Sequence, residues 1–383
     1  RARPLEVLKP HPGRREPPCP WFMVCGGCQY MHAAYDLQLE LKTAAALETL
    51  QRNSRIPCEL RPSPHALFYR DRVRLHAGVI SGRPRIGFFA ARTNRLIPIK
   101  FCFQLHPRLN LILPALEDWL ERLSFGGVSA AGLEVLAGPP AEGLMLVLNL
   151  NQKPSPEKRR LIEAGPNVAE KIQVHASVKG RLQVSGKTKA EPRGITWLRL
   201  EEPDLRLTAW PTVFTQVNSA VNRLLAVELP ARARETAPGR VLDLYAGFGN
   251  LTLPLAAAAQ QVVAVENNPY AHDNALFNLR LNRLKNVSLL REDAVEAAKA
   301  LAERGQCFDL IVLDPPRAGA GGLAIYLARL APARIFYLSC HPAAMVRDLA
   351  EFASLGYRPQ NLTAFDMFPQ TAHVEVLACL AKD

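Results

Sequence analysis

The 383-residue chain lacks several features that would assign it to a common class of protein. No apolar run reaches the roughly 18 residues of a membrane-spanning helix, and we find neither a secretory signal nor an internal repeat. The eight cysteines are unevenly clustered, which in a chain of this length argues against a disulfide framework and for metal binding or catalysis in a reducing compartment. We therefore expect a cytoplasmic protein without a membrane partner. Since the chain begins with Arg1 rather than Met, we also expect it to be trimmed.

Composition and charge describe a globular protein with an acidic partner. A mean hydropathy of -0.03 is typical of globular proteins, and the length allows two or three domains. The formal net charge of +12 favours a polyanionic partner over solubility alone. Basic residues recur in one stretch, several alternating with apolar ones as on one face of a sheet: Arg70, Arg72, Arg74, Arg83, Arg85, Arg92, Arg95, Lys100 and Arg108. We predict that this face contacts phosphates.

A strand–glycine–helix–strand–acid order indicates a nucleoside cofactor. The apolar run at 241–245 predicts a buried parallel strand, and Gly247 and Gly249 allow a tight turn close to a ligand. A second strand at 261–265 ends on Glu266, which suits the hydroxyls of a ribose. No third glycine supports a pyrophosphate, so S-adenosylmethionine fits better than NAD.

Four cysteines form a candidate metal centre. Cys25 and Cys28 enclose Gly26-Gly27, Cys19 lies upstream across a five-residue gap, and Cys102 lies where the chain could fold back. Unligated buried cysteines and zinc remain alternatives, but an iron–sulfur cluster is favoured because all four candidates are sulfur. The spacing is not the C-x3-C-x2-C of radical enzymes.

The chain divides into three parts at 1–62, 63–210 and 211–383. The first holds the cysteine motif and a helix at 33–52, whose expected apolar stripe is Leu37, Leu41, Ala44 and Leu47. The second is an α+β unit, in which we predict a helix at 108–123, a buried strand at 144–150 and a hairpin at 174–184. In the third, strands and helices alternate from 241 and close with a strand at 371–382, which predicts a doubly wound parallel sheet.

Three chemically useful side chains follow strands of that sheet. Asp314 ends a buried strand before two prolines, Cys340 ends the next strand, and Glu375 lies near the last one. An aromatic residue after the prolines would suggest methylation of an exocyclic amine, but Arg317 stands there. A thiolate, a carboxylate base and a methyl donor suit methylation of uracil C5: addition to C6 makes C5 nucleophilic, and the base then removes the C5 proton.

These motifs resemble the RNA uridine-5-methyltransferase family, specifically its iron–sulfur branch that acts on 23S ribosomal RNA. Matching patterns run in order from Cys19 nearly to the last residue: C-x5-C-G-G-C, F-x-Q-V-N, D-L-Y-x-G-x-G-N-x-T-L-P-L-A, D-P-P-R-x-G, S-C-x-P and F-P-x-T-x-H-V-E. The resemblance implies a Rossmann-like methyltransferase domain, with Cys340 as the nucleophile and Glu375 as the base. It also implies a methyl-donor pocket beside Gly247, lined by Gln216, Tyr245, Asn250, Glu266, Asp293 and Asp314.

The resemblance further implies a [4Fe–4S] cluster and an RNA site. The cluster would be held by Cys19, Cys25, Cys28 and Cys102. Phe214 would lie beside the flipped base, and we assign Arg317 to the substrate as well. Two departures from the family are Tyr245-Ala246 for Phe-Cys, and Asp293 for a frequent Asn. Residues 1–12 resemble the end of a TRAM domain, a small RNA-binding β-barrel, that trimming would have removed.

We thus predict transfer of a methyl group from S-adenosylmethionine to C5 of a uridine in 23S ribosomal RNA. A uridine in the T-loop of transfer RNA is the alternative substrate. A non-catalytic RNA-binding iron–sulfur protein and an exocyclic-amine methyltransferase are the rival functions. We infer no obligate protein partner.

Overall fold

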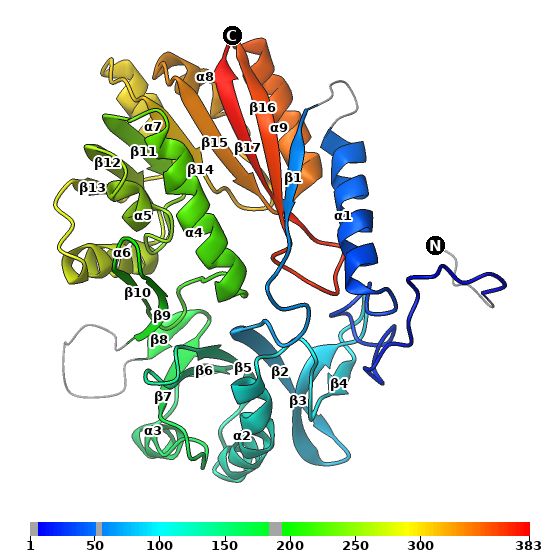
Figure 1. Ribbon diagram of the computed structural model, residues 1–383. Coiled ribbons are helices and arrows are strands. Elements are labelled where there is room, and N and C mark those ends of the chain that lie inside the picture. Colours follow the sequence, from blue (N-terminus) through cyan, green and yellow to red (C-terminus); the bar gives the residue numbers. More distant parts are fainter. Residues whose placement is uncertain (1–6, 51–55, 184–193) are drawn as a thin grey trace.

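The structure, a computed structural model, describes residues 7–50, 56–183 and 194–383. It forms two lobes, an upper one around a mainly parallel sheet and a lower one around a mainly antiparallel sheet (Figure 1). The expected TRAM remnant at 1–12 falls partly outside the described residues.

The upper lobe is a twisted, mainly parallel sheet. Its strands are β1 (Cys58–Arg61), β11 (Arg240–Leu244), β12 (Gln261–Val265), β13 (Val287–Leu290), β14 (Leu310–Leu313), β15 (Arg334–Ser339), β16 (Tyr357–Phe365) and β17 (Glu375–Lys382). Within the described chain these eight strands take the order β1-β16-β17-β15-β14-β11-β12-β13, and β17 runs antiparallel to both of its neighbours. The predicted doubly wound sheet is confirmed. The order reverses between β11 and β14, and open α/β sheets bind ligands at the carboxyl ends of strands at such a point.

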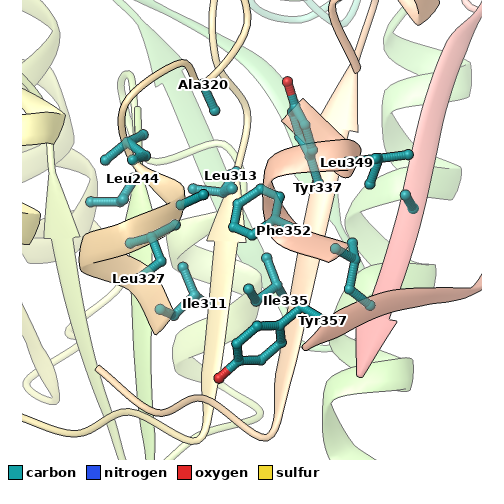
Figure 2. Packing of buried hydrophobic residues seen from close by; sticks show 14 of the residues in the cluster. Leu244, Ile311, Leu313, Ala320, Leu327, Ile335, Tyr337, Leu349, Phe352 and Tyr357 are labelled. Carbon is teal, nitrogen blue, oxygen red and sulfur yellow. The ribbon is translucent and has the colours of Figure 1, made fainter. Parts of the chain in front are cut away.

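Helices cover both faces of this sheet. Their bounds are α4 (Ser219–Arg234), α5 (Thr252–Ala256), α6 (Pro269–Leu281), α7 (Ala294–Glu303), α8 (Ala324–Arg329) and α9 (Pro342–Ser354). One face packs against α4 and α5, and the other against α7, α8 and α9. Figure 2 shows the second face, where Leu327 of α8 and Phe352 of α9 meet Ile311 and Ile335 of the sheet. Because both faces are covered, the strands are nearly continuous apolar runs.

The N-terminal part of the chain joins the upper lobe. Helix α1 (Tyr35–Leu50) lies beside α9, and β1 pairs in parallel with β16, Cys58 opposite Leu362 (Figure 1). Residues before 62 therefore extend the sheet built by the last third of the chain.

The apolar stripe predicted for α1 is wrong. Leu41 is 43% exposed and Ala44 is exposed as well. The helix instead buries a row at a spacing of four residues: Gln38, Lys42, Ala46 and Leu50. Two of these are polar, because the surface they cover includes the polar loop between β16 and β17.

The lower lobe carries the second sheet. Its strands are β2 (Arg72–Ile80), β3 (Arg83–Phe89), β4 (Leu96–Pro98), β5 (Ala130–Ala137), β6 (Leu144–Leu150), β7 (Ile172–Val178) and β8 (Arg181–Gln183). In the described ranges they are ordered β4-β3-β2-β5-β6-β7-β8, with α2 (Pro107–Phe125) and α3 (Pro156–Glu163) packed against them. The helix, buried strand and hairpin predicted for this region are confirmed. A separate hairpin, β9 (Ile195–Leu200) and β10 (Leu205–Ala209), then leads back to the upper lobe.

The basic stretch of the lower lobe is only partly a free face. Four of its arginines make ion pairs within the lobe, namely Arg72–Glu134, Arg74–Glu134, Arg85–Glu117 and Arg108–Glu170. The exposed basic residues are Arg74, Arg83, Arg92, Arg95 and Lys100. The predicted contact with phosphates stays a prediction, and these exposed residues are the ones free to make it. Among the residues described, no helix is both long and apolar enough to cross a membrane.

Candidate active site and cysteine cavity

The turn after β11 has the geometry predicted for a cofactor site. Tyr245, Gly247 and Gly249 all have positive φ, at 65, 58 and 94°. A Cβ on Gly247 would meet no atom within 4 Å, so open space lies over that position. The Glu266 carboxylate, at the end of β12, accepts hydrogen bonds from the backbone N–H groups of Gly247 (2.8 Å) and Asn268 (2.7 Å). These bonds orient the carboxylate, whose remaining lone pairs can accept hydroxyl protons.

Cys340 and Glu375 lie on adjacent strands at the carboxyl edge of the sheet. Cys340 directly follows β15, and Glu375 begins β17; the residues beside them, Ser339 and Val376, are register partners. Glu375 is 3% exposed, whereas Cys340 is half-buried. Asp314 ends the next strand, β14. Three predicted residues from distant parts of the sequence thus meet at one edge of the sheet.

Burial controls the ionisation of these groups. It raises the pKa of Glu375 well above its usual range, and the negative charge of Asp314 raises it further. The pKa of Asp314 is itself raised by burial, to about 7. Burial and then the charge of Glu375 raise the pKa of Cys340, while Arg317 lowers the pKa of both Cys340 and Glu375. Helix α9 begins at Pro342, two residues after Cys340, and burial is the largest cause of the raised pKa of that thiol.

Cys340 borders a cavity that a ring could enter. The cavity has a volume of about 260 Å³, compared with about 30 Å³ for one water molecule in the liquid. Cys340, His341 and His373 line it together with α1 residues that include Lys42. Cys340 is therefore one of the residues that line a space several times the volume of a water molecule.

The loop between β10 and α4 carries two predicted residues. Gln216 is buried, at 8% exposed, whereas the Phe214 side chain is 68% exposed. Arg72 of β2 holds this loop by donating a 2.6 Å hydrogen bond to the Val213 carbonyl, and its guanidinium lies 6.0 Å from the centre of the Phe214 ring. A base could stack on this ring because one end of the loop is fixed by the lower lobe.

The four cysteines of the candidate metal centre line one cavity. Cys19, Cys25, Cys28 and Cys102 surround a space of about 250 Å³ between the N-terminal segment and the lower lobe. Cys25 forms an isolated β-bridge with Ala90, at the end of β3. The side-chain amide of Gln104 donates a 3.0 Å hydrogen bond to the Cys28 sulfur. The folding back of Cys102 that the sequence suggested brings it to the other three cysteines.

The turn in this segment differs from the expected one. Positive φ occurs at Met23 (68°) rather than at Gly26 or Gly27. Gly26 instead approaches another strand end closely: its N–H donates a 3.1 Å hydrogen bond to the Phe89 carbonyl, and an added Cβ would lie 3.3 Å from that oxygen. The glycine permits close packing of two chain segments rather than a left-handed turn.

Known proteins similar to this chain give its family. Residues 195–383 match the model of the tRNA (Uracil-5-)-methyltransferase family. The 23S rRNA (uracil(1939)-C(5))-methyltransferase RlmD of Pectobacterium atrosepticum is 34% identical over 391 aligned residues, with 100% of this chain and 83% of that protein covered. The enzyme of the same name from Cronobacter sakazakii is 36% identical, with 98% and 84% covered. The chain belongs to the RNA uracil-C5 methyltransferase family.

A solved structure supports the fold of this methyltransferase over nearly its whole length. The tRNA (uracil-54, C5)-methyltransferase of Pyrococcus abyssi, in complex with S-adenosyl-L-homocysteine, superposes with a TM-score of 0.70 at 24% identity. The alignment covers 98% of this chain and 88% of that structure. The protein is thus an S-adenosylmethionine-dependent enzyme that methylates C5 of uridine in RNA, as the sequence predicted.

Two polar residues of the methyltransferase were missed by the sequence analysis. Asn222 of α4 is fully buried and forms a reciprocal amide pair with Asn250, with N···O distances of 2.8 and 2.9 Å. Asp243, in the middle of β11, accepts a 2.5 Å hydrogen bond from the Thr252 hydroxyl, and burial raises its pKa to about 7. Asp243 was readable as an acid inside an apolar strand, whereas nothing in the sequence paired Asn222 with Asn250.

Asp293 of the enzyme has a structural role in addition to the predicted one. It is the N-cap of α7, and its Oδ1 accepts hydrogen bonds from the N–H groups of Val295 (2.8 Å) and Glu296 (3.4 Å). The capping bonds fix the side chain at the exposed end of the helix.

Proposed function

We propose that this enzyme methylates a uridine of 23S ribosomal RNA through a covalent adduct between Cys340 and C6 of the base. The observation that carries the mechanism is the meeting of Cys340 and Glu375 on adjacent strands, close enough for the charge of one to shift the pKa of the other. The substrate is inferred from relatives of that printed activity that align with nearly the whole chain.

The proposed reaction proceeds in two stages. The Cys340 thiolate first forms a bond to C6 with its electron pair, and the resulting enolate attacks the methyl group of S-adenosylmethionine through C5. The bond between that methyl group and the sulfonium sulfur breaks, and its electron pair leaves with S-adenosylhomocysteine. The Glu375 carboxylate then removes the C5 proton, the electron pair restores the C5–C6 double bond, and the C6–S bond breaks with its pair returning to sulfur. A carboxylate of raised pKa is a stronger proton acceptor once ionised, so the burial of Glu375 suits this role.

The methyl donor is proposed to bind over the turn that follows β11. Gly247 leaves open space there, and Gln216, Tyr245 and Asn250 lie on the segments around it. Glu266 is proposed to bind the ribose hydroxyls and Asp293 the adenine. Asp314 directly follows β14, next to the strand that leads to Cys340, and its carboxylate when ionised is proposed to favour the positive sulfonium of the donor.

RNA is proposed to approach from the junction of the lobes. The target uridine must leave its stack, which costs a few kcal/mol. Stacking on the exposed Phe214 ring contributes about 1–3 kcal/mol per base. The exposed basic residues of the lower lobe supply phosphate contacts, and Arg317 is proposed to contact the bound uridine.

The decisive experiment uses RNA transcribed with 5-fluorouridine. Fluorine at C5 cannot leave as a proton, so the enzyme with S-adenosylmethionine should stall as a covalent complex, seen as a retarded band on a denaturing gel. Fragments of 23S ribosomal RNA should give the band with the wild-type enzyme and not with Cys340→Ala. No band on any RNA, in protein that binds the methyl donor, would overturn the covalent mechanism.

Transfer RNA is the competing substrate. The matching family model and the superposed archaeal structure both name transfer RNA uracil. A band on transfer RNA but not on 23S fragments would keep the chemistry and change the substrate. Mapping 5-methyluridine in both RNAs from a deletion strain would then identify the natural site.

We further propose that the cysteine cavity holds a [4Fe–4S] cluster. Among the described residues, no group of three or more Cys, His, Asp or Glu side chains is drawn together tightly enough for one metal ion. Thiolates on a single tetrahedral zinc would lie about 3.8 Å apart, given a Zn–S distance of about 2.3 Å. In a [4Fe–4S] cluster each thiolate binds a different iron, and the cavity of about 250 Å³ that the four cysteines line is proposed to hold such a cluster.

Electrostatics agree with a cationic occupant. Burial raises the pKa of Cys28 to about 12, and the charges of Cys102, Cys25 and Cys19 contribute to the increase. Four thiolates therefore require positive charge beside them. Because the proposed methyl transfer needs no electron, the cluster is assigned a structural role, holding residues 19–28 against the lower lobe near the RNA.

The cluster has its own test. Cys28→Ser should lose the brown colour and most of the iron and sulfide and should bind RNA more weakly. Cys307→Ser, which changes an exposed cysteine outside the cavity, is the matched control. Normal iron content in Cys28→Ser, or normal RNA affinity in a colourless and folded variant, would contradict this proposal.

A further inference from the structure

The loop between β16 and β17 leads directly into the proposed base. It spans residues 366–374, and Glu375 is the next residue. In Figure 1 it runs down to the junction of the lobes, near the lower end of α1. The sheet fixes the loop only at its two ends, through the pairing of β16 with β17. Its conformation must therefore be set by other parts of the chain.

One residue in this loop is held from three sides by the N-terminal segment. Gln370 is fully buried and has a φ of 68°. Its N–H donates a 3.0 Å hydrogen bond to the side chain of Gln38, and its Oε1 accepts one of 3.0 Å from the same side chain. Oε1 also accepts a 3.3 Å bond from Arg15, while Nε2 donates one of 2.9 Å to the Ala66 carbonyl. Both polar atoms of the Gln370 side chain are therefore hydrogen-bonded to residues that lie outside the upper sheet.

The backbone of Gln370 is held by the segment that lines the cysteine cavity. Its carbonyl accepts 2.9 Å hydrogen bonds from the N–H groups of both Gln29 and Tyr30. Gln29 directly follows Cys28, one of the residues around the cavity. The cysteine segment and the loop before the base are therefore joined by main-chain hydrogen bonds.

A buried ion pair holds the start of the same loop. The Lys42 ammonium of α1 lies 2.5 Å from the Asp366 carboxylate, and both side chains are 0% exposed. Lys42 also donates a 2.9 Å hydrogen bond to the Phe368 carbonyl, and the Tyr35 hydroxyl donates one of 2.8 Å to Asp366. Helix α1 buries these polar groups in place of the leucines expected at its interface.

These features cost free energy that packing alone does not require. A non-glycine residue at positive φ costs about 1–3 kcal/mol, and strain of this kind clusters at active sites. A buried ion pair is seldom more stabilising than apolar side chains of similar volume. A misplacement of about 1 Å in a reacting group, however, can cost about a hundredfold in rate. Stability alone does not explain these contacts, whereas holding Glu375 in place does.

We propose that Gln370, Gln38 and Lys42 are positioning residues that hold the loop so that Glu375 meets the C5 proton. The proposal rests on the proposed function, because it assigns these residues to its second stage alone. Their loss leaves C6 addition and methyl transfer intact and slows removal of the C5 proton. The methylated adduct, still bonded to Cys340, should then accumulate on ordinary uridine.

The test compares the two stages in Gln38→Ala and in Gln370→Gly, which tolerates the positive φ. Each is mixed in a single turnover with ordinary RNA and methyl-labelled S-adenosylmethionine, and label is followed in the covalent complex and in free RNA. Methyl transfer should change less than about twofold, while release slows by about tenfold to a hundredfold. Leu41→Ala, on the exposed side of α1, is the matched control, and thermal melting shows that each variant is folded.

The outcomes separate this proposal from the proposed function. With 5-fluorouridine RNA, wild type and both variants should form the adduct to the same extent; its absence in wild type would refute the covalent mechanism itself. A wild-type adduct there, with no adduct on ordinary uridine in folded Gln38→Ala or Gln370→Gly, would overturn the positioning role. Equal slowing of both stages would overturn it too, since that is the result of general destabilisation.

Discussion

Replacement of Lys42 by methionine should destabilise the enzyme strongly, although methionine is a good helix former of similar length. The ammonium faces the Asp366 carboxylate at 2.5 Å, and neither side chain is exposed. Burial already lowers the pKa of Lys42, and the charge of Asp366 offsets part of that effect. Without the ammonium, the Asp366 carboxylate keeps the hydrogen bond from the Tyr35 hydroxyl but has lost its buried cation. Removing one partner of a buried pair costs about 3–5 kcal/mol, which is a large share of the roughly 5–15 kcal/mol that stabilises a domain.

Urea unfolding followed by circular dichroism measures this loss. The double variant Lys42→Met/Asp366→Leu should be more stable than the single one, because no uncompensated charge remains buried. Leu41→Met, on the exposed side of the same helix, should stay within about 0.5 kcal/mol of wild type.

Two results would refute this reasoning. If Lys42→Met were as stable as Leu41→Met, the ion pair of the structure would not form in solution. If the double variant were no more stable than the single one, the loss would come from packing and not from an unpaired charge.

Three further changes test the active site. Glu375→Gln should transfer the methyl group but retain the RNA, so a covalent complex with ordinary uridine should appear on a denaturing gel; rapid release of methylated RNA would exclude this base. Because burial raises the pKa of Glu375 well above its usual range, and only the ionised carboxylate accepts a proton, kcat should rise with pH at values above those at which an ordinary glutamate ionises. Arg317 lowers the pKa of Glu375 and of Cys340, so Arg317→Met should move the rise of kcat to higher pH. Arg317→Lys keeps the positive charge and should leave the rise near its wild-type position. An unchanged pH profile in the methionine variant would contradict this electrostatic role of Arg317. Asn222→Ala should weaken S-adenosylmethionine binding by about tenfold, as measured by calorimetry. The variant leaves the Asn250 amide at the cofactor turn unpaired, which costs about 1–3 kcal/mol. Unchanged affinity would show that the amide pair does not shape the site.

The sequence pattern of α1 did not predict the interaction of this helix with the loop between β16 and β17. Leu41 and Ala44 have apolar side chains at helical spacing, so they predicted a core face, yet they are exposed. The residues that are buried, Gln38 and Lys42, find their partners more than 300 positions away in the sequence. Polar burial of this kind depends on which distant groups complete the hydrogen bonds, and a pattern within one helix carries no such information.

The charge state of the site was also decided by its surroundings. The sequence placed Cys340 after a strand and implied a nucleophile there, but it carried no information on what surrounds the thiol. The structure places Glu375 beside the Cys340 thiol, where Glu375 is buried and Cys340 half-buried, and burial raises the pKa of both groups. In the same way Arg72 seemed available to phosphate until its ion pair with Glu134 was visible.

The sequence by itself determined the alternation of strands and helices in the upper sheet from residue 241 on, the turn at Gly247 and Gly249, and the family. Buried strands and glycine turns are encoded by neighbouring residues, and ordered motifs need no coordinates to be recognised. Tertiary structure decided how the N-terminal segment meets the β16–β17 loop and what ionises at Cys340. Those properties depend on burial and on hydrogen bonds between distant residues, and both exist only once the chain has folded.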